Sequence, residues 1–453
     1  MGKDKDDILL RRLALEIVIM VNKKEEYSHI AIKSVLDKYD YLENQKKAFV
    51  KRLASGVIEN KIKLDYCISQ YSKTKLNKLK PVVLAILELG VYQILFMENV
   101  YDTKACNLMV DIAKQKGLSN LSGFINGVLR NVARNKDTLT FPAKEADKVK
   151  YLSIEYSMPV ELVELLLSQY GEELTETILK SAVQTGDVYI RFCGEAKANK
   201  AKLIESWVKL GAEVTNVEGI PDAAAIKKAS VASLEGFDEG AFTVQDLSSQ
   251  MIGVLAPVKS GDTVIDVCAA PGGKSTHIAD RLEGTGTVYA CDITDYKVDK
   301  IWENVERLGL TNVKPTLQDA TVNKSDWEAC ADLVLADVPC SGLGVIGKKP
   351  DIKYRLTKEQ LKSIVTLQRS IIDNVVKYVK KDGYLMYSTC TINREENEEN
   401  VKYIIDNYPY EVVRVENVPD RLKEFVTSEG YLKTLEGVSG TDGFFIAILR
   451  RKN

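Results

Sequence analysis

The sequence of 453 residues contains only two histidines, His29 and His277, and its eight cysteines form no Cys-x-x-Cys pair. These absences argue against a zinc site and against a disulfide framework, and they fit a reducing cytoplasm. No stretch is apolar enough to span a bilayer, and the first residues lack the apolar core of a signal peptide. We therefore expect a cytoplasmic protein that needs no metal and contacts no membrane.

The net charge of −2 conceals an asymmetry along the chain. Residues 1–150 contain 27 Lys and Arg against 18 Asp and Glu, a net charge of +9, whereas the remainder has a net charge of −11. A basic N-terminal third followed by an acidic remainder indicates contact with a polyanion, although a solvated helical surface explains the same pattern. The candidate phosphate contacts are Arg11, Arg12, Lys46, Lys47, Lys51 and Arg52.

The length and the patterning predict several domains. Residues 1–135 show apolar positions at helical spacing and are predicted to be all-helical, with Pro81 in a first turn and Gly90 interrupting or ending that helix. A polar linker is expected at 136–144. A small α/β domain is expected at 145–240, with a helix from Pro159 to about Ser181 and a strand at 187–192.

Residues 241–453 alternate between predicted strands and helices, which is typical of a doubly wound, largely parallel, Rossmann-like sheet. Thr357 and Gln360 form a capping box for a helix expected to continue to about Val379. Asp382 and Gly383 are predicted to form a turn into a strand at 384–388. The fold class is therefore multi-domain: an all-α front, a small α+β middle domain and an α/β domain at the end.

A glycine-rich loop follows the first predicted strand of the last domain. It consists of Cys268, Ala269, Ala270, Pro271, Gly272, Gly273 and Lys274. Glycines allow a ligand to approach the backbone, and a helix start presents free N–H groups. The GxxxxGK[ST] spacing is absent, which disfavours a nucleoside triphosphatase. Taken alone, a Gly-Gly pair after a strand is as often a plain tight turn.

Acidic residues strengthen the case for a nucleoside ligand. Asp266, Asp292, Asp319 and Asp337 each end a predicted strand, and Asp292 lies where a carboxylate binds ribose hydroxyls. A single strand-end acid is often a helix cap, but four in the same register are hard to explain in this way. The pattern favours an adenosine-containing cofactor bound without its phosphates, which indicates S-adenosylmethionine rather than NAD.

Cys340 and Cys390 each follow a predicted buried strand and lie in a polar turn, whereas the other cysteines are expected to be inert packing residues. A thiolate that adds to C6 of cytosine makes C5 nucleophilic enough to take a methyl group. One cysteine would attack, the second would assist release, and Asp337 could hold the base edge and assist protonation.

At these motifs the chain resembles the RNA (cytosine-5)-methyltransferase family. The resemblance rests on blocks at 245–250, 268–274, 337–344 with 350–353, 388–391 and 440–445. It implies that Cys390 is the nucleophile, that Cys340 aids release, and that Lys274 and Asp337 complete the catalytic set. It also implies cofactor contacts from Cys268 to Lys274 and from Asp292, Asp319 and Asp337. Lys297, Ser439 and residues 347–349 depart from the usual pattern.

The front resembles the NusB-type helical RNA-binding fold at 89–97 and 123–130. Together the two resemblances cover almost the whole chain and are similar to the RsmB-type (Sun/Fmu) enzymes. This implies methylation of C5 of one cytosine in 16S-type small-subunit ribosomal RNA, either naked or within a partial ribosomal particle. Two other readings stay open: exchanged cysteine roles, as in DNA cytosine-5 enzymes, and a non-enzymatic RNA-binding assembly or antitermination factor.

Overall fold

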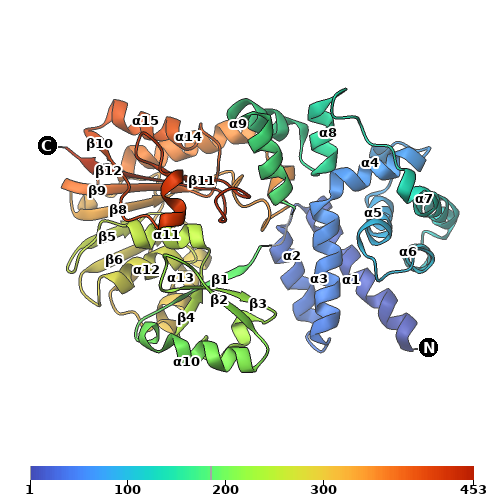
Figure 1. Ribbon diagram of the computed structural model, residues 1–453, viewed down its shortest axis with the longest axis horizontal. Coiled ribbons are helices and arrows are strands. Elements are labelled where there is room, and N and C mark those ends of the chain that lie inside the picture. The colour runs from blue at the N-terminus through green and yellow to red at the C-terminus, as the bar shows by residue number, and fades with distance from the viewer. Residues whose placement is uncertain (1, 184–185, 453) are drawn as a thin grey trace. The chain divides into compact units, whose positions relative to one another are not determined.

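The computed structural model describes residues 2–183 and 186–452 (Figure 1). The chain divides into two compact units. The first, the helical unit, comprises Met1–Gln184 together with Ile346–Leu356, and the second, the sheet unit, comprises Thr185–Val345 together with Thr357–Asn453. Among the described residues, no helix has both the length and the apolar character needed to cross a membrane.

The helical unit confirms the predicted all-α front. Its α-helices are α1 (Gly2–Lys24), α2 (Ser28–Leu36), α3 (Asn44–Glu59), α4 (Lys61–Tyr71), α5 (Pro81–Phe96), α6 (Asp102–Gln115), α7 (Ser122–Asn135), α8 (Lys148–Glu155) and α9 (Val160–Ser181). Helix α5 is buried along most of its length and packs against α1, α3, α4, α6 and α7. An apolar helix of this kind needs neighbours on every side, which explains why helices surround it.

Two expectations for this unit were wrong. Gly90 does not end its helix, since α5 continues to Phe96. A Cβ at Gly90 would meet a methyl carbon of Leu129 at 2.6 Å, so the glycine allows α5 and α7 to approach closely. Arg11 is not a surface cation: it is 2% exposed and donates from Nε to Gln93 Oε1 at 2.6 Å, because it lies on the inner side of α1.

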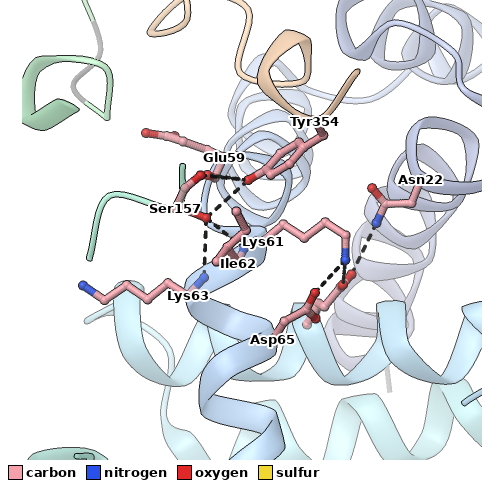
Figure 2. Close-up of polar contacts among 9 residues, drawn as sticks. Asn22, Glu59, Lys61, Ile62, Lys63, Asp65, Ser157 and Tyr354 are labelled. Atoms are coloured by element: carbon pink, nitrogen blue, oxygen red, sulfur yellow. Dashed lines mark hydrogen bonds and ion pairs between the residues drawn. The ribbon is translucent and has the colours of Figure 1, made fainter. Parts of the chain in front are cut away.

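Residues 346–356 fold with the helical unit, although they continue directly from the block that contains Cys340. The short 3-10 helix Ile352–Arg355 brings Tyr354 against α3 and the turn before α9. Its hydroxyl lies 3.1 Å from the carbonyl oxygen of Glu59 and 3.2 Å from Ser157 Oγ (Figure 2). Ser157 Oγ in turn accepts from the backbone N–H of Ile62 at 2.8 Å, which joins three stretches of chain.

Three further side chains anchor the same segment. Lys353, 1% exposed, donates from Nζ to the Glu59 carbonyl at 2.8 Å, and Arg355 donates to the Glu26 carbonyl at 2.6 Å. The carboxylate of Asp351 accepts from the backbone N–H and the hydroxyl of Ser28. Burial lowers the pKa of Lys353 to about 8, because its effect outweighs the charge of Glu59, which raises that pKa. The segment is therefore an integral part of the helical unit.

A small antiparallel sheet opens the sheet unit. It contains β1 (Val188–Phe192), β2 (Glu213–Asn216), β3 (Ala223–Lys227) and β4 (Phe242–Val244) in the order β2-β3-β1-β4, with α10 (Ala196–Lys209) packed on it. Its core stacks Trp207 on Phe192, with ring centroids 5.8 Å apart. Strands β3 and β4 were not predicted, because their short runs lack a clear alternation of apolar and polar residues.

The large sheet has the strand order β10-β12-β9-β8-β5-β6-β7, and β11 pairs with β12. Strands β9, β8, β5, β6 and β7 pair in parallel, whereas β12 pairs antiparallel with β9. Its strands are β5 (Thr263–Asp266), β6 (Thr287–Asp292), β7 (Val313–Leu317), β8 (Ala331–Asp337), β9 (Val379–Thr389), β10 (Tyr410–Val413), β11 (Leu432–Thr434) and β12 (Phe444–Arg451). Its helices are α11 (Leu247–Leu255), α12 (Gly273–Arg281), α13 (Asp295–Arg307), α14 (Lys358–Val375) and α15 (Glu398–Asn407).

Helices cover both faces of this sheet (Figure 1). Val264 packs in one core with α11, α12 and α13, and its neighbour Ile265 packs in the opposite core with α14 and α15. Burial on both faces explains the nearly continuous apolar runs, and the doubly wound architecture that they predicted is confirmed. The multi-domain fold class is likewise confirmed, whereas the domain boundaries at 136–144 and 240 stay predictions.

Two predicted boundaries near β9 were wrong. The capping box of Thr357 and Gln360 is present, but α14 ends at Val375 and not near Val379. Strand β9 already begins at Val379, and Asp382 lies inside it with a φ of 58°. The pairing with β8 shifts register at this point, so the Asp-Gly pair forms an irregularity within one strand instead of a turn before it.

We predict that Tyr354→Phe loosens residues 346–356 without unfolding the helical unit. The change removes one of the two hydrogen bonds to the Glu59 carbonyl and the contact with Ser157 Oγ, which costs about 1 kcal/mol and raises the opening of the segment about fivefold. Hydrogen exchange read by mass spectrometry should show faster exchange in 346–356 and unchanged exchange in α5. Tyr101→Phe, at a side chain that is 81% exposed, is the matched control. Unchanged exchange in Tyr354→Phe would contradict the proposed anchoring.

Candidate active site

The predicted acidic residues gather at one edge of the large sheet. Asp337, Asp266 and Asp292 are the last residues of β8, β5 and β6, which are neighbouring parallel strands. Asp319 follows two residues after the end of β7, the next strand in the order. The carboxyl ends of parallel strands meet at the same edge, where ligands bind in open α/β sheets. The four acids that the sequence places at or near strand ends therefore lie along the same edge of the sheet.

The loop Cys268–Lys274 joins the end of β5 to α12 at this edge. Gly272 has a φ of 103°, a conformation that favours glycine, and its N–H bonds to the Ala269 carbonyl at 2.7 Å. The backbone N–H of Ala270 donates to Asp292 Oδ2 at 3.1 Å, and Lys297 Nζ lies 2.9 Å from Asp292 Oδ1. Asp292 therefore holds the loop against the end of β6, and Lys297 neutralises part of its charge.

Asp266 is fully buried beneath the loop. Its Oδ2 accepts from Ser275 Oγ at 2.5 Å, whereas Oδ1 has no hydrogen-bond partner in the described structure. Burial raises the pKa of Asp266 to about 7, and the charge of Asp337 adds to the effect. The carboxyl is therefore partly protonated near neutral pH. Its Oδ1 lies beneath the loop without a hydrogen-bond partner in the described structure.

Lys274 and Asp337 form an ion pair beside the loop, with side chains 19% and 20% exposed. Ser388 Oγ donates to the other carboxylate oxygen of Asp337 at 2.8 Å, which connects the ends of β8 and β9. Burial lowers the pKa of Lys274, but the attraction of Asp337 outweighs it and the net shift is upward. Lys274 thus stays charged, and its charge also interacts with Cys390.

The two predicted cysteines meet at this edge: Cys340 Sγ and Cys390 Sγ are 3.2 Å apart. Cys340 lies three residues after the end of β8, and Cys390 directly follows β9. All eight cysteines, each within the described residues, are free thiols. The hydrogen bond with Cys390 raises the pKa of Cys340, and burial and the charge of Glu396 act in the same direction. Cys340 therefore keeps its proton.

A buried carboxylate lies behind both cysteine loops. Glu396 is 0% exposed, and its Oε2 accepts from the backbone N–H of Ser341 at 2.8 Å. Its Oε1 accepts from Ser341 Oγ at 2.6 Å and from Asn393 Nδ2 at 3.1 Å. Gln368, from α14, donates to Oε2 at 3.1 Å. One side chain therefore binds the loop after β8, the turn after β9 and a covering helix.

Glycines bring the backbones of the two loops into direct contact. The N–H of Gly344 donates to the Cys390 carbonyl at 3.0 Å, and the N–H of Gly443 donates to the Gly344 carbonyl at 2.8 Å. A Cβ at Gly344 would meet the Gly443 carbonyl oxygen at 1.9 Å, so a larger residue does not fit. The family-like blocks at 337–344, 388–391 and 440–445 are thus assembled at one place.

Comparisons with known proteins agree with this assembly. A family model described as "16S rRNA methyltransferase RsmB/F" matches residues 252–450, and a "NusB family" model matches residues 9–134. The chain is 36% identical, over 98% of its length, to the Bacillus subtilis (strain 168) protein named "Probable ribosomal RNA small subunit methyltransferase B", of which 99% is covered. The chain belongs to the RsmB/F rRNA methyltransferase family.

Two further matches extend over almost the whole chain. A Synechocystis sp. protein with the same name is 33% identical over 98% of this chain and is covered completely. The crystal structure of PH0851 has a TM-score of 0.82 and 26% identity, with 97% of this chain and 98% of that chain covered. The predicted family and enzyme class are confirmed. The chain is a methyltransferase of the RsmB/F family with an N-terminal NusB-family domain. The family is dependent on S-adenosylmethionine.

The loop edge of this RsmB/F chain fits an adenosine-containing cofactor. Gly273, at the start of α12, is not crowded by its neighbours, since a Cβ there would meet only Gln245, at the ordinary contact distance of 3.9 Å. Asp292 and Asp319 bring carboxylate oxygens, which accept from ribose hydroxyls and amino groups, to the neighbouring strand ends. The roles of Cys268–Lys274, Asp292, Asp319 and Asp337 in binding stay predictions.

Sequence reasoning missed Glu396. It stands between Glu395 and Glu398 in an acidic stretch that indicates a solvated surface, and no pattern distinguishes the buried carboxylate from the exposed Glu395 beside it. The block at 350–353, which the resemblance groups with 337–344, folds with the helical unit. The departure at Lys297 now has a structural role, because this residue pairs with Asp292.

We predict that Asp266→Asn flattens the pH dependence of stability between about pH 4 and 7. The folded-state pKa, about 7, lies above the unfolded value of about 3.9, so the native protein holds a proton that the unfolded chain has lost. This contribution is complete below about pH 4 and disappears as the pH rises through 7. Denaturation midpoints of wild type and variant across this range measure it. The exposed Asp299→Asn is the control, and parallel profiles of wild type and Asp266→Asn would contradict the prediction.

Proposed function

We propose that this protein transfers a methyl group from S-adenosylmethionine to C5 of a specific cytosine in small-subunit ribosomal RNA, through a covalent adduct between Cys390 and C6. The observation that carries the proposal is the pair of thiols 3.2 Å apart at the ligand edge of the sheet. A methyltransferase acting on a nucleophilic nitrogen or oxygen needs neither thiol, whereas C5 of cytosine is too poor a nucleophile to react without help.

Cys390 is the residue that we assign as nucleophile. The charge of Lys274 interacts with it and favours its thiolate, the form that attacks. The new bond between Cys390 Sγ and C6 pushes electron density toward C5. S-adenosylmethionine, when bound, supplies an electrophilic methyl group, and Asp337 lies beside the cysteines, where it can accept from the amino group of the base.

Cys340 is the residue that we assign to product release. After methylation, a base, either water or a carboxylate, takes the proton from C5, and the electrons of that C–H bond form the double bond between C5 and C6. The bond from C6 to Cys390 breaks at the same time, with both of its electrons returning to sulfur. A protonated Cys340 Sγ within hydrogen-bond distance of that sulfur stabilises the departing thiolate. The raised pKa of Cys340 supports this assignment over the exchanged one, because a thiol that keeps its proton is a poor nucleophile.

The proposed partner is small-subunit ribosomal RNA, either naked or in a partial ribosomal particle, and such a substrate places the protein in the cytoplasm. The target base must leave its stack to reach the two cysteines. The exposed cations Arg12, Lys51 and Arg52 of the NusB-family domain remain candidates for phosphate contacts. Lys46 and Lys47 pair with Asp6 and Asp40, so they are weaker candidates.

We predict that the wild-type protein, with labelled S-adenosylmethionine, forms 5-methylcytosine in unmodified small-subunit rRNA and not in tRNA. Nucleoside analysis of the two RNAs, and of a partial small-subunit particle, identifies the product and the substrate class. Cys390→Ala should lower the rate by at least about 10³-fold, because the nucleophile is gone, while cofactor binding survives. Label in tRNA alone, or wild-type turnover by Cys390→Ala, would contradict the proposal.

We predict that Cys340→Ala accumulates a protein–RNA adduct. The methylated base stays bound to Cys390 when the group that stabilises the leaving thiolate is removed. Denaturing gels after incubation with S-adenosylmethionine and rRNA should show a slow band that is absent in the double variant Cys340→Ala/Cys390→Ala. A Cys340→Ala protein that turns over without any such band would show that Cys340 is not the release residue.

A further inference from the structure

We infer that Glu396 is a positioning residue for the methyl transfer. From its buried position behind the two cysteine loops, it holds Cys340 and Cys390 at the separation that the reaction needs. The inference rests on the proposed function of the two cysteines and goes beyond it, since Glu396 touches neither thiol. Its carboxylate instead accepts from Ser341, the residue after Cys340, and from Thr391, the residue after Cys390.

The contacts on the Cys340 side fix the loop at its backbone. Ser341 is the next residue after Cys340, and both its N–H and its hydroxyl donate to Glu396. Gln368 donates to Glu396 and, at 2.9 Å, to the carbonyl of Pro339, the residue before Cys340. The residue after Cys340 is thus bound to Glu396, and the residue before it is bound to Gln368, which is itself bound to Glu396.

The contacts on the Cys390 side fix the turn after β9. Asn393 donates to Glu396, and Thr391 Oγ1 lies 2.7 Å from Ser341 Oγ. The backbone carbonyl of Glu396 accepts from the Tyr387 hydroxyl at 2.6 Å, and the next residue, Asn397, accepts from Thr389 Oγ1 at 2.5 Å. Asn397 Nδ2 also donates to the Thr391 carbonyl at 2.9 Å, so the two residues that flank Cys390 are both held from the same buried turn.

The chemistry of the carboxylate explains why a neutral side chain would not serve in its place. Ionised carboxylate only accepts, and the groups that surround Glu396 are a backbone N–H, two amide N–H groups and hydroxyls, all able to donate. Glutamine has nearly the same shape, but it would turn an N–H toward donors. One or more of these buried donors would lose its acceptor, and the two loops would no longer be bound together.

The test compares Glu396→Gln with Glu395→Gln, an exposed neighbour of identical chemistry. Steady-state kinetics of the full-length protein on small-subunit rRNA should show kcat lower by about 10²-fold in Glu396→Gln, with both KM values unchanged, because misplacement by about 1 Å has an effect of this size. Glu395→Gln should match wild type. If wild type itself makes no 5-methylcytosine, the proposed function fails and the next measurement decides the inference alone.

That measurement is alkylation of the cysteines by iodoacetamide at a series of pH values, read peptide by peptide without RNA. The Glu396 charge disfavours the Cys340 thiolate, so its removal should shift the Cys340 profile to lower pH. Reduced burial shifts the profile in the same direction, so Ser341→Ala, which removes a contact of the same loop and keeps the charge, is run beside it and should shift the profile less. If Glu396→Gln does not fold, Ser341→Ala removes only the hydroxyl contact and should lower kcat with unchanged KM. In a folded Glu396→Gln protein, an unchanged Cys340 profile or an unchanged kcat overturns the inference.

Discussion

The parallel pairing of β5, β6, β7, β8 and β9 is the constraint on which the site depends. Because these strands run in one direction, their carboxyl ends meet at one edge, and residues far apart in sequence become neighbours there. Cys340 and Cys390 are 50 residues apart along the chain and 3.2 Å apart in space. The three strand-end acids, Asp319 just beyond β7 and the glycine-rich loop reach the same edge for the same reason.

The sheet determines where the loops begin, but their shape beyond the strands is determined by polar contacts. Glu396 binds the loop after β8 to the turn after β9, and Gly344 packs its backbone against Cys390 and Gly443. Buried networks of this kind are rigid only when every donor has an acceptor. A rigid support suits chemistry in which one thiol must attack and a second must remain within hydrogen-bond distance of it.

The sequence predicted features that follow from periodicity and from motif residues. The alternating strands and helices, the capping box at Thr357 and the two cysteines at strand ends were all found where expected. It did not predict features that depend on tertiary neighbours. The helix through Gly90 continues because Leu129 packs against it, and Glu396 is buried although its acidic surroundings indicate solvent. Likewise, nothing in the block 337–353 indicates that its second half folds with the helical unit.

The central claim is that Cys390 forms the bond to the base while Cys340 assists its release. The most direct test uses small-subunit rRNA that contains 5-fluorocytosine, because fluorine at C5 cannot leave as a proton and the methylated adduct persists. Wild-type protein is incubated with this RNA and S-adenosylmethionine, digested with protease and nuclease, and analysed by mass spectrometry. Our account predicts a methylated fluorocytidine nucleotide on the peptide that contains Cys390. The same nucleotide on the Cys340 peptide would contradict it.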